Sequence, residues 1–139
     1  MRLNRDSWKI IELIIMRYPE KKKEYDEYVS DIINSSSPSE GHIGSSEEYS
    51  KPQSVTEAKA LKLSNAYARK LKKEIDAVEF VYRGLSEEEK KVMRIRYWSN
   101  RYKKTPYLKM SQCSYSERQM KRIVLKIIIQ VGRYLGEIN

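Results

Sequence analysis

The chain has 139 residues, one cysteine and a net charge of +9 at pH 7. This length accommodates one modest domain and an appendage, and no apolar run reaches the roughly 18 residues that a membrane span needs. Cys113 has no second cysteine to pair with, which favours a reducing, intracellular compartment, and the interrupted apolar start predicts no signal peptide.

The positive charge is concentrated in the second part of the chain. Residues 1–60 contain 9 Lys/Arg and 11 Asp/Glu, whereas residues 61–139 contain 19 and 8. A solvated lysine-rich surface would account for this composition, and so would contact with a polyanion such as DNA. The motifs decide between the two.

Residues 1–34 have the pattern of a helical hairpin that is interrupted at Pro19. Asn4 or Asp6 can cap the first helix. Its apolar residues follow at helical spacing and are Trp8, Ile11, Ile14, Ile15 and Tyr18. The second helix is expected to end near Asn34 and to bury Tyr25, Tyr28, Val29, Ile32 and Ile33.

Residues 35–53 are rich in Ser, Pro and Gly and have almost no aliphatic side chains. Burial in such a segment cannot offset the entropy lost on ordering, so we predict a flexible linker. The single histidine, His42, lies within it and has no second histidine or cysteine nearby that would build a metal or catalytic site.

A long helix is predicted from Ser54 or Thr56 to Gly84, a residue suited to the left-handed conformation after a helix end. Its apolar seam has alternating steps of three and four and comprises Leu61, Ser64, Ala68, Leu71, Ile75, Val78, Tyr82 and Leu85. The seam could pack within the chain or against a second copy. A short chain needs such a face for its own core, which favours the first.

The next predicted helix opens with a capping box formed by Ser86 and Glu89, and further glutamates in its first turn favour the helix dipole. It is expected to end near Ser99 and Asn100. Its apolar contacts are predicted at Val92, Met93, Ile95 and Trp98. The basic loop that follows, residues 101–104, is well placed to contact phosphate groups.

Thr105 and Pro106 predict the start of a short scaffold helix that continues to about Cys113. Leu108, Met110 and Cys113 are expected to pack inward. Ser114 and Tyr115 would form the turn of a helix-turn-helix.

The last helix is predicted to begin at a second capping box, formed by Ser116 and Gln119. Its apolar face consists of Met120, Ile123, Val124, Ile127, Ile128, Val131 and Leu135. Charged residues at its N-terminal end lie outside that apolar face. This is the end with which recognition helices contact base edges. The candidate DNA-binding residues are therefore Arg101, Lys103, Lys104, Thr105, Ser116, Glu117, Arg118, Gln119, Lys121 and Arg122.

These motifs resemble region 4 of bacterial sigma-70 factors, through Leu85, Glu87 to Glu89 and the helix end Ile95-Arg96-Tyr97. Over most of its length the chain is more similar to the RinA/ArpU family of phage transcriptional regulators. The segments that carry this resemblance are residues 28–34 (YVSDIIN), Ala77-Val78-Glu79, Arg96-Tyr97-Trp98 and Ser116-Glu117-Arg118-Gln119.

The resemblance implies a small DNA-binding activator of late phage genes in the cytoplasm of a bacterial host. By the same similarity, the DNA-reading end would be Ser116, Glu117, Arg118, Gln119, Lys121 and Arg122. The chain departs from the family in the scaffold helix, where Lys109 and Met110 replace Ile-Ala, and in the turn, where Ser114 replaces Gly or Asn. Leu108 is expected to supply the missing apolar contact.

We therefore predict an all-α protein with an N-terminal helical hairpin (1–34), a flexible linker (35–53) and a long helix carrying a sigma-region-4-like helix-turn-helix (54–139). The predicted function is sequence-specific binding of double-stranded DNA and activation of transcription. A plain helical bundle with a charged surface would share the composition, but not the two capping boxes and the charged helix start.

Two other functions fit the same sequence. An adaptor that binds host RNA polymerase or a sigma factor would account for Leu125 and Ile129, which lie off the buried stripe and need cover. A small terminase-like DNA-recognition subunit would share the helix-turn-helix, and a homodimer is left open. No glycine-rich phosphate loop, metal-spaced Cys/His set or nucleophile–base pair occurs, so we expect neither an enzyme nor a bound cofactor or metal.

Overall fold

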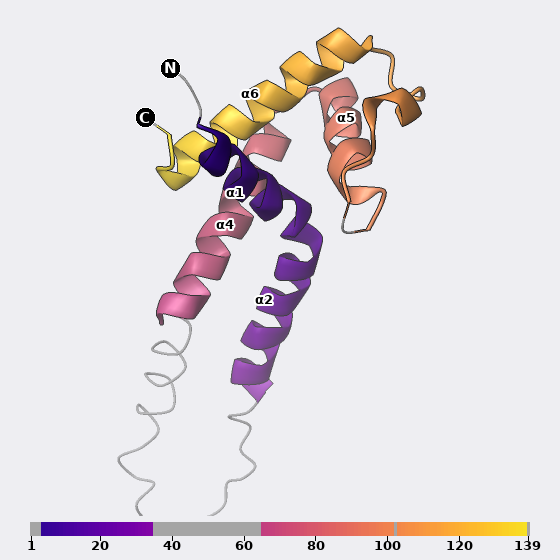
Figure 1. The fold of residues 1–139 in the computed structure, drawn as a ribbon. Helices are drawn as coiled ribbons and strands as arrows, with labels where there is room; N and C mark the ends of the chain where they lie inside the picture. Colours follow the sequence, from indigo (N-terminus) through magenta and orange to yellow (C-terminus); the bar gives the residue numbers. More distant parts are fainter. Residues whose placement is uncertain (1–3, 35–64, 102, 139) are drawn as a thin grey trace, which may run out of the picture. The chain divides into compact units, whose positions relative to one another are not determined.

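The computed structural model describes residues 4–34, 65–101 and 103–138, and within these ranges it contains helices and turns but no strand (Figure 1). The prediction of an all-α fold is confirmed. The elements are α1 (Arg5–Met16), α2 (Tyr18–Asn34), α4 (Ala66–Arg83), α5 (Glu87–Trp98), the short 3₁₀ helix η3 (Tyr107–Lys109) and α6 (Glu117–Leu135). None of the described helices is long and apolar enough to cross a membrane.

The chain divides into two compact units, one made of residues 1–20 and 73–139 and the other of residues 21–72. The first unit therefore combines α1 with the C-terminal helices. The predicted linker (35–53), His42 and the predicted start of the long helix lie outside the described residues. The three-part division at residues 34 and 53 stays a prediction.

In the second unit, residues 21–34 of α2 contact the first turns of α4. Asn65 caps α4 by accepting a hydrogen bond from the Ala68 amide at 2.8 Å, and its Nδ2 donates to the Tyr28 hydroxyl at 2.9 Å. The rings of Tyr28 and Tyr67 meet edge to face, with 5.9 Å between their centroids. The contacts between these segments thus combine hydrogen bonds with ring packing.

The predicted buried face of α2 is only partly correct. Ile32 is buried, whereas Tyr25, Tyr28 and Val29 are half-buried and Ile33 is 53% exposed. Among the described residues, the first turns of α4 cover one stripe of this part of α2, and tyrosine keeps its hydroxyl near water while its ring packs.

The start of α1 follows the prediction. The Asn4 side chain accepts a hydrogen bond from the Ser7 amide at 3.0 Å and so caps the helix, while Ile11 and Ile15 are fully buried. The break lies at Arg17, and Pro19 falls in the first turn of α2, where a missing N–H costs no helical hydrogen bond.

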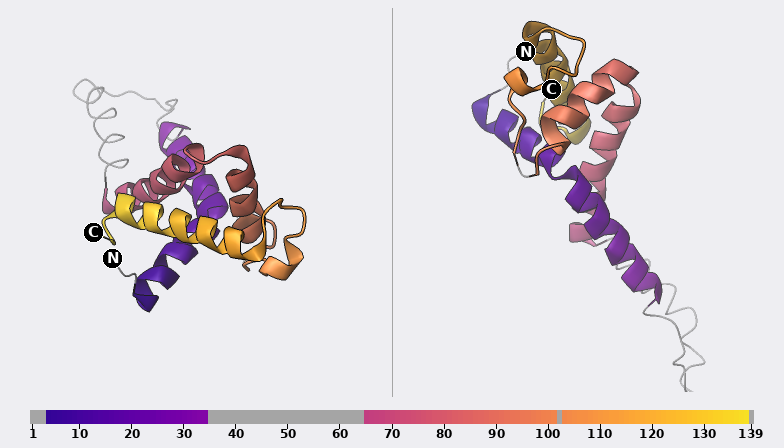
Figure 2. Two further views of the ribbon diagram at one scale, coloured as in Figure 1. Left: turned by 90° about the horizontal axis from the view of Figure 1, so that it is seen from above. Right: turned by 90° about the vertical axis from the view of Figure 1, so that its right-hand side faces the viewer.

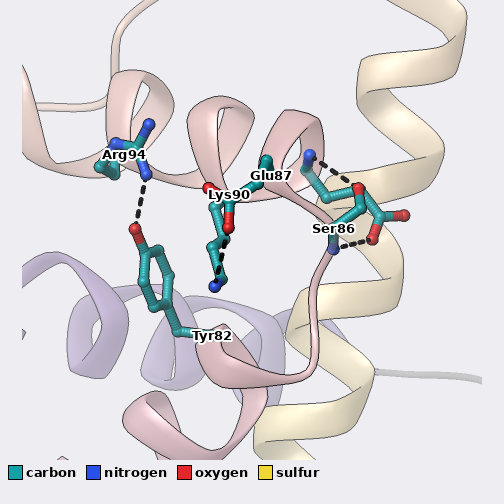
Figure 3. Close-up of polar contacts among 6 residues, drawn as sticks. Tyr82, Ser86, Glu87, Lys90 and Arg94 are labelled. Atoms are coloured by element: carbon teal, nitrogen blue, oxygen red, sulfur yellow. Dashed lines mark hydrogen bonds and ion pairs between the residues drawn. The ribbon is translucent and has the colours of Figure 1, made fainter.

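Both predicted capping boxes are present. The Ser86 hydroxyl accepts from the Glu89 amide at 3.2 Å, and Glu89 Oε1 accepts from the Ser86 amide at 3.0 Å. The corresponding distances for Ser116 and Gln119 are 3.2 and 2.9 Å. Figure 3 shows the Ser86 box at the start of α5.

The side chains that follow this box along α5 also make local contacts. Lys90 pairs with Glu87 at 3.4 Å, and Arg94 Nη1 donates to the Tyr82 hydroxyl at 2.6 Å (Figure 3). Because Tyr82 belongs to α4, the second contact joins α5 to the preceding helix.

The core of the first unit is organised around α6. Figures 1 and 2 show α6 lying across α1, with α5 beside its N-terminal half. The buried residues of α6 are the predicted ones: Met120, Ile123, Val124, Ile127, Ile128 and Val131, with Leu135 half-buried. They pack against α1, α5 and the last turns of α4, which contribute Ile11, Ile15, Ala77, Val78, Val81, Val92, Met93 and Tyr97.

The two helix ends at glycine differ. The prediction of a left-handed Gly84 is wrong, because among the described glycines positive φ occurs at Gly136, with a value of 80°. The end of α4 is tightened instead by hydrogen bonds from Gly84 N to Val81 O and from Leu85 N to Tyr82 O, both 3.1 Å. Gly136 ends α6 in the left-handed conformation that glycine adopts at little cost.

Gly132 of α6 leaves room for the side chains of Ile11 in α1 and of Ile138, which leads to a prediction. A Cβ at this position would lie 2.4 Å from Ile138 Cδ1 and 2.7 Å from Ile11 Cδ1. Because Ile11 is fully buried, we expect Gly132→Ala to lower the free energy of unfolding by about 1–3 kcal/mol, despite the better helix propensity of alanine.

The matched control is Gly84→Ala, whose Cβ would meet its nearest neighbour at 3.6 Å. This variant should lie within about 0.5 kcal/mol of the unmodified chain. Thermal unfolding followed by circular dichroism compares the two. Equal stability of both variants would contradict the close packing of α1 on α6.

Candidate nucleic-acid interface

The predicted DNA-reading residues gather at the start of α6, here called the α6 tip (residues 116–122). Ser116, Glu117, Arg118, Gln119, Lys121 and Arg122 are all exposed. Met120 and Ile123, on the opposite side of the same turns, are buried in the core. The helix therefore holds these polar side chains on a fixed backbone and directs them into solvent.

The cations of the α6 tip are not equally free. Lys121 pairs with Glu117 at 3.0 Å, and its ammonium also lies 5.7 Å from the centroid of the Tyr107 ring. Arg118 and Arg122 make no hydrogen bond or ion pair with any described residue. The two arginines are thus available to a ligand without the loss of an internal contact.

The acidic start of α5 is tied to the middle of α6. Lys126 pairs with Glu89 at 3.2 Å, and Glu88 accepts a hydrogen bond from the Ser114 hydroxyl at 3.0 Å. The hydrogen bond from the Ser86 amide, aided by Lys126 and opposed by burial, lowers the pKa of Glu89 below its usual value. These contacts hold the α6 tip in place relative to α5.

The cations of the predicted basic loop (residues 101–104) do not all face solvent in the same way. Arg101 and Lys103 are exposed, whereas Lys104 turns toward α1 and pairs with Glu12 at 2.9 Å. From the sequence, Lys104 was predicted to contact phosphate groups of DNA. In the structure this cation already neutralises a buried carboxylate.

Thr105 is also engaged within the protein. It is 8% exposed; its amide donates to Arg96 O, and its carbonyl accepts from Arg96 Nη1, both at 2.8 Å. Its hydroxyl lies 3.0 Å from that of Ser99. With these groups occupied, Thr105 positions the loop and offers little to a ligand.

Glu12 is the centre of the interior polar contacts of this unit. It is 6% exposed, and its second carboxylate oxygen accepts from the Tyr97 hydroxyl at 2.8 Å. Burial and the charge of Glu12 raise the pKa of Tyr97 far above its usual value, so the phenol stays a hydrogen-bond donor. We call Glu12, Tyr97 and Lys104 the Glu12 cluster. Sequence analysis missed it, although a glutamate between Ile11 and Ile15 on an apolar face was a usable signal.

The predicted scaffold helix is wrong. Only the three-residue 3₁₀ turn η3 forms. Pro106 stands at its N-cap position in extended conformation, and the threonine before it bonds to Arg96 instead of capping a helix. The Arg96 guanidinium lies 4.0 Å from the centroid of the Tyr107 ring, and this stack holds the segment. Leu108, predicted to pack inward, is 88% exposed.

Met110 and Cys113 are buried as predicted. Burial raises the pKa of the Cys113 thiol, so it behaves as a small apolar residue and not as a nucleophile. Within the described ranges, no three His, Cys, Asp or Glu side chains come together in a way that could hold a metal ion.

Comparison with known proteins gives no family for this chain. No protein-family model matches it, and neither a curated protein nor a solved structure shows significant similarity to it. The resemblance to RinA/ArpU regulators and to sigma region 4 therefore stays a prediction drawn from its motifs.

Adjacent lysines of the loop provide a matched pair of variants. Lys104→Ala removes one partner of the buried Glu12, and because the lysine side chain is 40% exposed we expect a modest loss of roughly 1–2 kcal/mol in unfolding free energy. Lys103→Ala, which removes an exposed side chain, should stay within about 0.5 kcal/mol of the unmodified chain. Urea unfolding measures both, and indistinguishable midpoints would argue against the Glu12 cluster.

Proposed function

We propose that this chain is a sequence-specific DNA-binding regulator of transcription that places the α6 tip in the major groove of duplex DNA. The observation that supports this most strongly is the state of Arg118 and Arg122, which are exposed and without a hydrogen bond or ion pair among the described residues. Arginine at the start of a recognition helix can bond to both acceptors of a guanine edge.

The surroundings of the α6 tip supply the non-specific part of the proposed binding. Exposed cations lie on the segments that lead to it, at Arg101, Lys103 and Lys109. Lysine and arginine that neutralise phosphates displace condensed counterions, which makes binding strongly salt-dependent. In this assignment Lys104 and Thr105, predicted from sequence to touch DNA, stabilise the loop instead.

The start of α6 is held in place by other contacts, although no scaffold helix precedes it. Burial of Met110 and Cys113, the contact of Lys121 with Tyr107 and the bond from Ser114 to Glu88 hold the preceding segment against α5 and α6. Rigid placement matters because base-edge hydrogen bonds require side chains that start from a fixed backbone.

The resemblance to RinA/ArpU regulators narrows the proposal to activation of late phage genes in the cytoplasm of a bacterial host. The direct experiment is a fluorescence-anisotropy titration of the full chain with labelled late-promoter duplex and with a scrambled duplex of equal length. We expect tighter binding to the promoter and a loss of about 10³-fold or more in affinity between 50 and 200 mM salt if six or more phosphates are contacted. Binding that depends on neither salt nor sequence would overturn the proposal.

Substitutions at Arg118 and Arg133 distinguish the loss of a base contact from the loss of one positive charge. Arg118→Ala should cost roughly 1–3 kcal/mol on the preferred duplex and relax specificity at one position, because a base contact is lost. Arg133→Ala removes an equal charge from an exposed site in the last turn of the same helix and should change affinity little. Competition titrations with single-base variants of the duplex measure both, and equal effects of the two substitutions would contradict base reading by Arg118.

A second function, an adaptor for RNA polymerase or a sigma factor, is favoured by a different surface. Phe80 is 62% and Tyr134 42% exposed, and their ring centroids are 5.3 Å apart. They line an open hollow of about 830 Å³ whose other residues include Arg83 and Arg133. Exposed aromatic pairs of this kind often mark protein contacts. Capture of purified polymerase without DNA, lost in Phe80→Ala, would favour this function over the first.

A further inference from the structure

A second cationic hollow lies at the start of α1. It has a volume of about 540 Å³ and is lined by Arg5, Trp8, Lys9, Glu12 and Lys104. No ligand was predicted for α1 from the sequence, and no residue of the α6 tip lines this hollow. We call it the α1 cradle.

The carboxylate in the α1 cradle pairs with Lys104 and leaves the other two cations, Arg5 and Lys9, without an ion pair among the described residues. Both oxygens of Glu12 are used, one by Tyr97 and one by Lys104. Arg5 and Lys9 are exposed and make no hydrogen bond or ion pair with any described residue. Lys104 is already paired with Glu12, so the positive charge available to a ligand is that of Arg5 and Lys9. The hollow therefore offers positive charge and free donors.

Arg5 occupies a position in α1 that is electrostatically unfavourable for a cation. It is the first residue of α1, where the partial positive charge of the helix end disfavours a cation. Asp6, in the same turn, offsets part of this effect. The indole N–H of Trp8, which also makes no hydrogen bond within the described part of the chain, adds a further donor beside these cations.

The α1 cradle lies on the side of α6 that also carries η3, so a DNA duplex bound at the α6 tip could extend toward it. Both views in Figure 2 place α1 and η3 on the same side of α6. Lys104 joins the cradle to the loop that leads into η3, and Lys121 joins η3 to the α6 tip through Tyr107. Cations are thus present along one side of the unit, from the start of α1 to the start of α6.

We propose that the α1 cradle binds backbone phosphates of the same duplex whose bases the α6 tip reads. This inference rests on the proposed function and adds a second point of attachment to it. Phosphate contacts of this kind fix the register and orientation of a protein on DNA and carry no sequence information. The cradle would therefore set the angle at which α6 enters the groove.

The test compares two double variants of the full chain with equal loss of charge. Arg5→Gln with Lys9→Gln should weaken binding to preferred and scrambled duplexes by the same factor, roughly tenfold at 0.1 M salt, and reduce the salt slope by about 2. The control, Lys73→Gln with Arg133→Gln, removes two exposed cations of the same unit outside the cradle and should leave affinity and slope nearly unchanged.

The two tryptophans provide a readout that does not depend on affinity. Trp8 lines the cradle, whereas the half-buried Trp98 lies outside it and donates its indole N–H to Ile15 O at 2.7 Å. In ¹H–¹⁵N spectra, addition of duplex should move the Trp8 indole signal and leave that of Trp98 in place.

The outcomes separate this inference from the proposed function. If the unmodified chain binds DNA, but the two double variants bind equally well and the Trp8 signal does not move, the α1 cradle is wrong and the α6 tip stands. If the unmodified chain binds no duplex, both fall. A loss of specific binding with scrambled binding retained would also overturn the cradle, because a phosphate contact acts on all sequences alike.

Discussion

A carboxylate that is removed from water must be paired and hydrogen-bonded, and Glu12 meets this requirement with partners from two distant parts of the chain. Its oxygens accept from Tyr97 in α5 and from Lys104 in the following loop. Loss of either partner would leave a buried charge under-satisfied, which is costly. The Glu12 cluster therefore fixes α1 against α5, and Trp98 strengthens this attachment by bonding to Ile15 O.

The position of α1 in turn determines how α6 is held. Ile11, one residue before Glu12, packs where α6 has Gly132 instead of a larger residue. With α1 on one side and α5 on the other, the apolar face of α6 is closed over and its polar start remains in solvent. The basic residues of this unit consequently divide into two groups. Arg96, Lys104 and Lys126 bind internal partners, whereas Arg118 and Arg122 face outward.

Local sequence was sufficient for features that depend on near neighbours. The caps at Asn4, Ser86 and Ser116 form because the side chain and the amide it accepts from are three residues apart, and no tertiary contact is needed. The buried face of α6 could be predicted because it follows helical spacing over five turns.

Predictions from sequence were wrong in two situations. In one, the partner of a side chain is far away in the sequence; in the other, two adjacent side chains could each make the same contact. Lys104 looked like a free cation because its partner, Glu12, is 92 residues away. Thr105 looked like a helix cap, but Arg96 takes its carbonyl, and the ring of Tyr107, not Leu108, makes the inward contact. Such choices depend on which of two adjacent side chains reaches a given partner, and periodicity does not resolve this.

We propose that the rigidly held α6 tip reads base sequence. The most direct measurement is selection by the full chain from a pool of random-sequence duplexes at physiological salt, followed by sequencing, with Arg118→Ala and Arg133→Ala in parallel. We expect one enriched motif for the unmodified chain, the same motif for Arg133→Ala, and a motif degenerate at one position for Arg118→Ala. A pool that stays random, or a motif that Arg118→Ala leaves intact, would contradict the proposal.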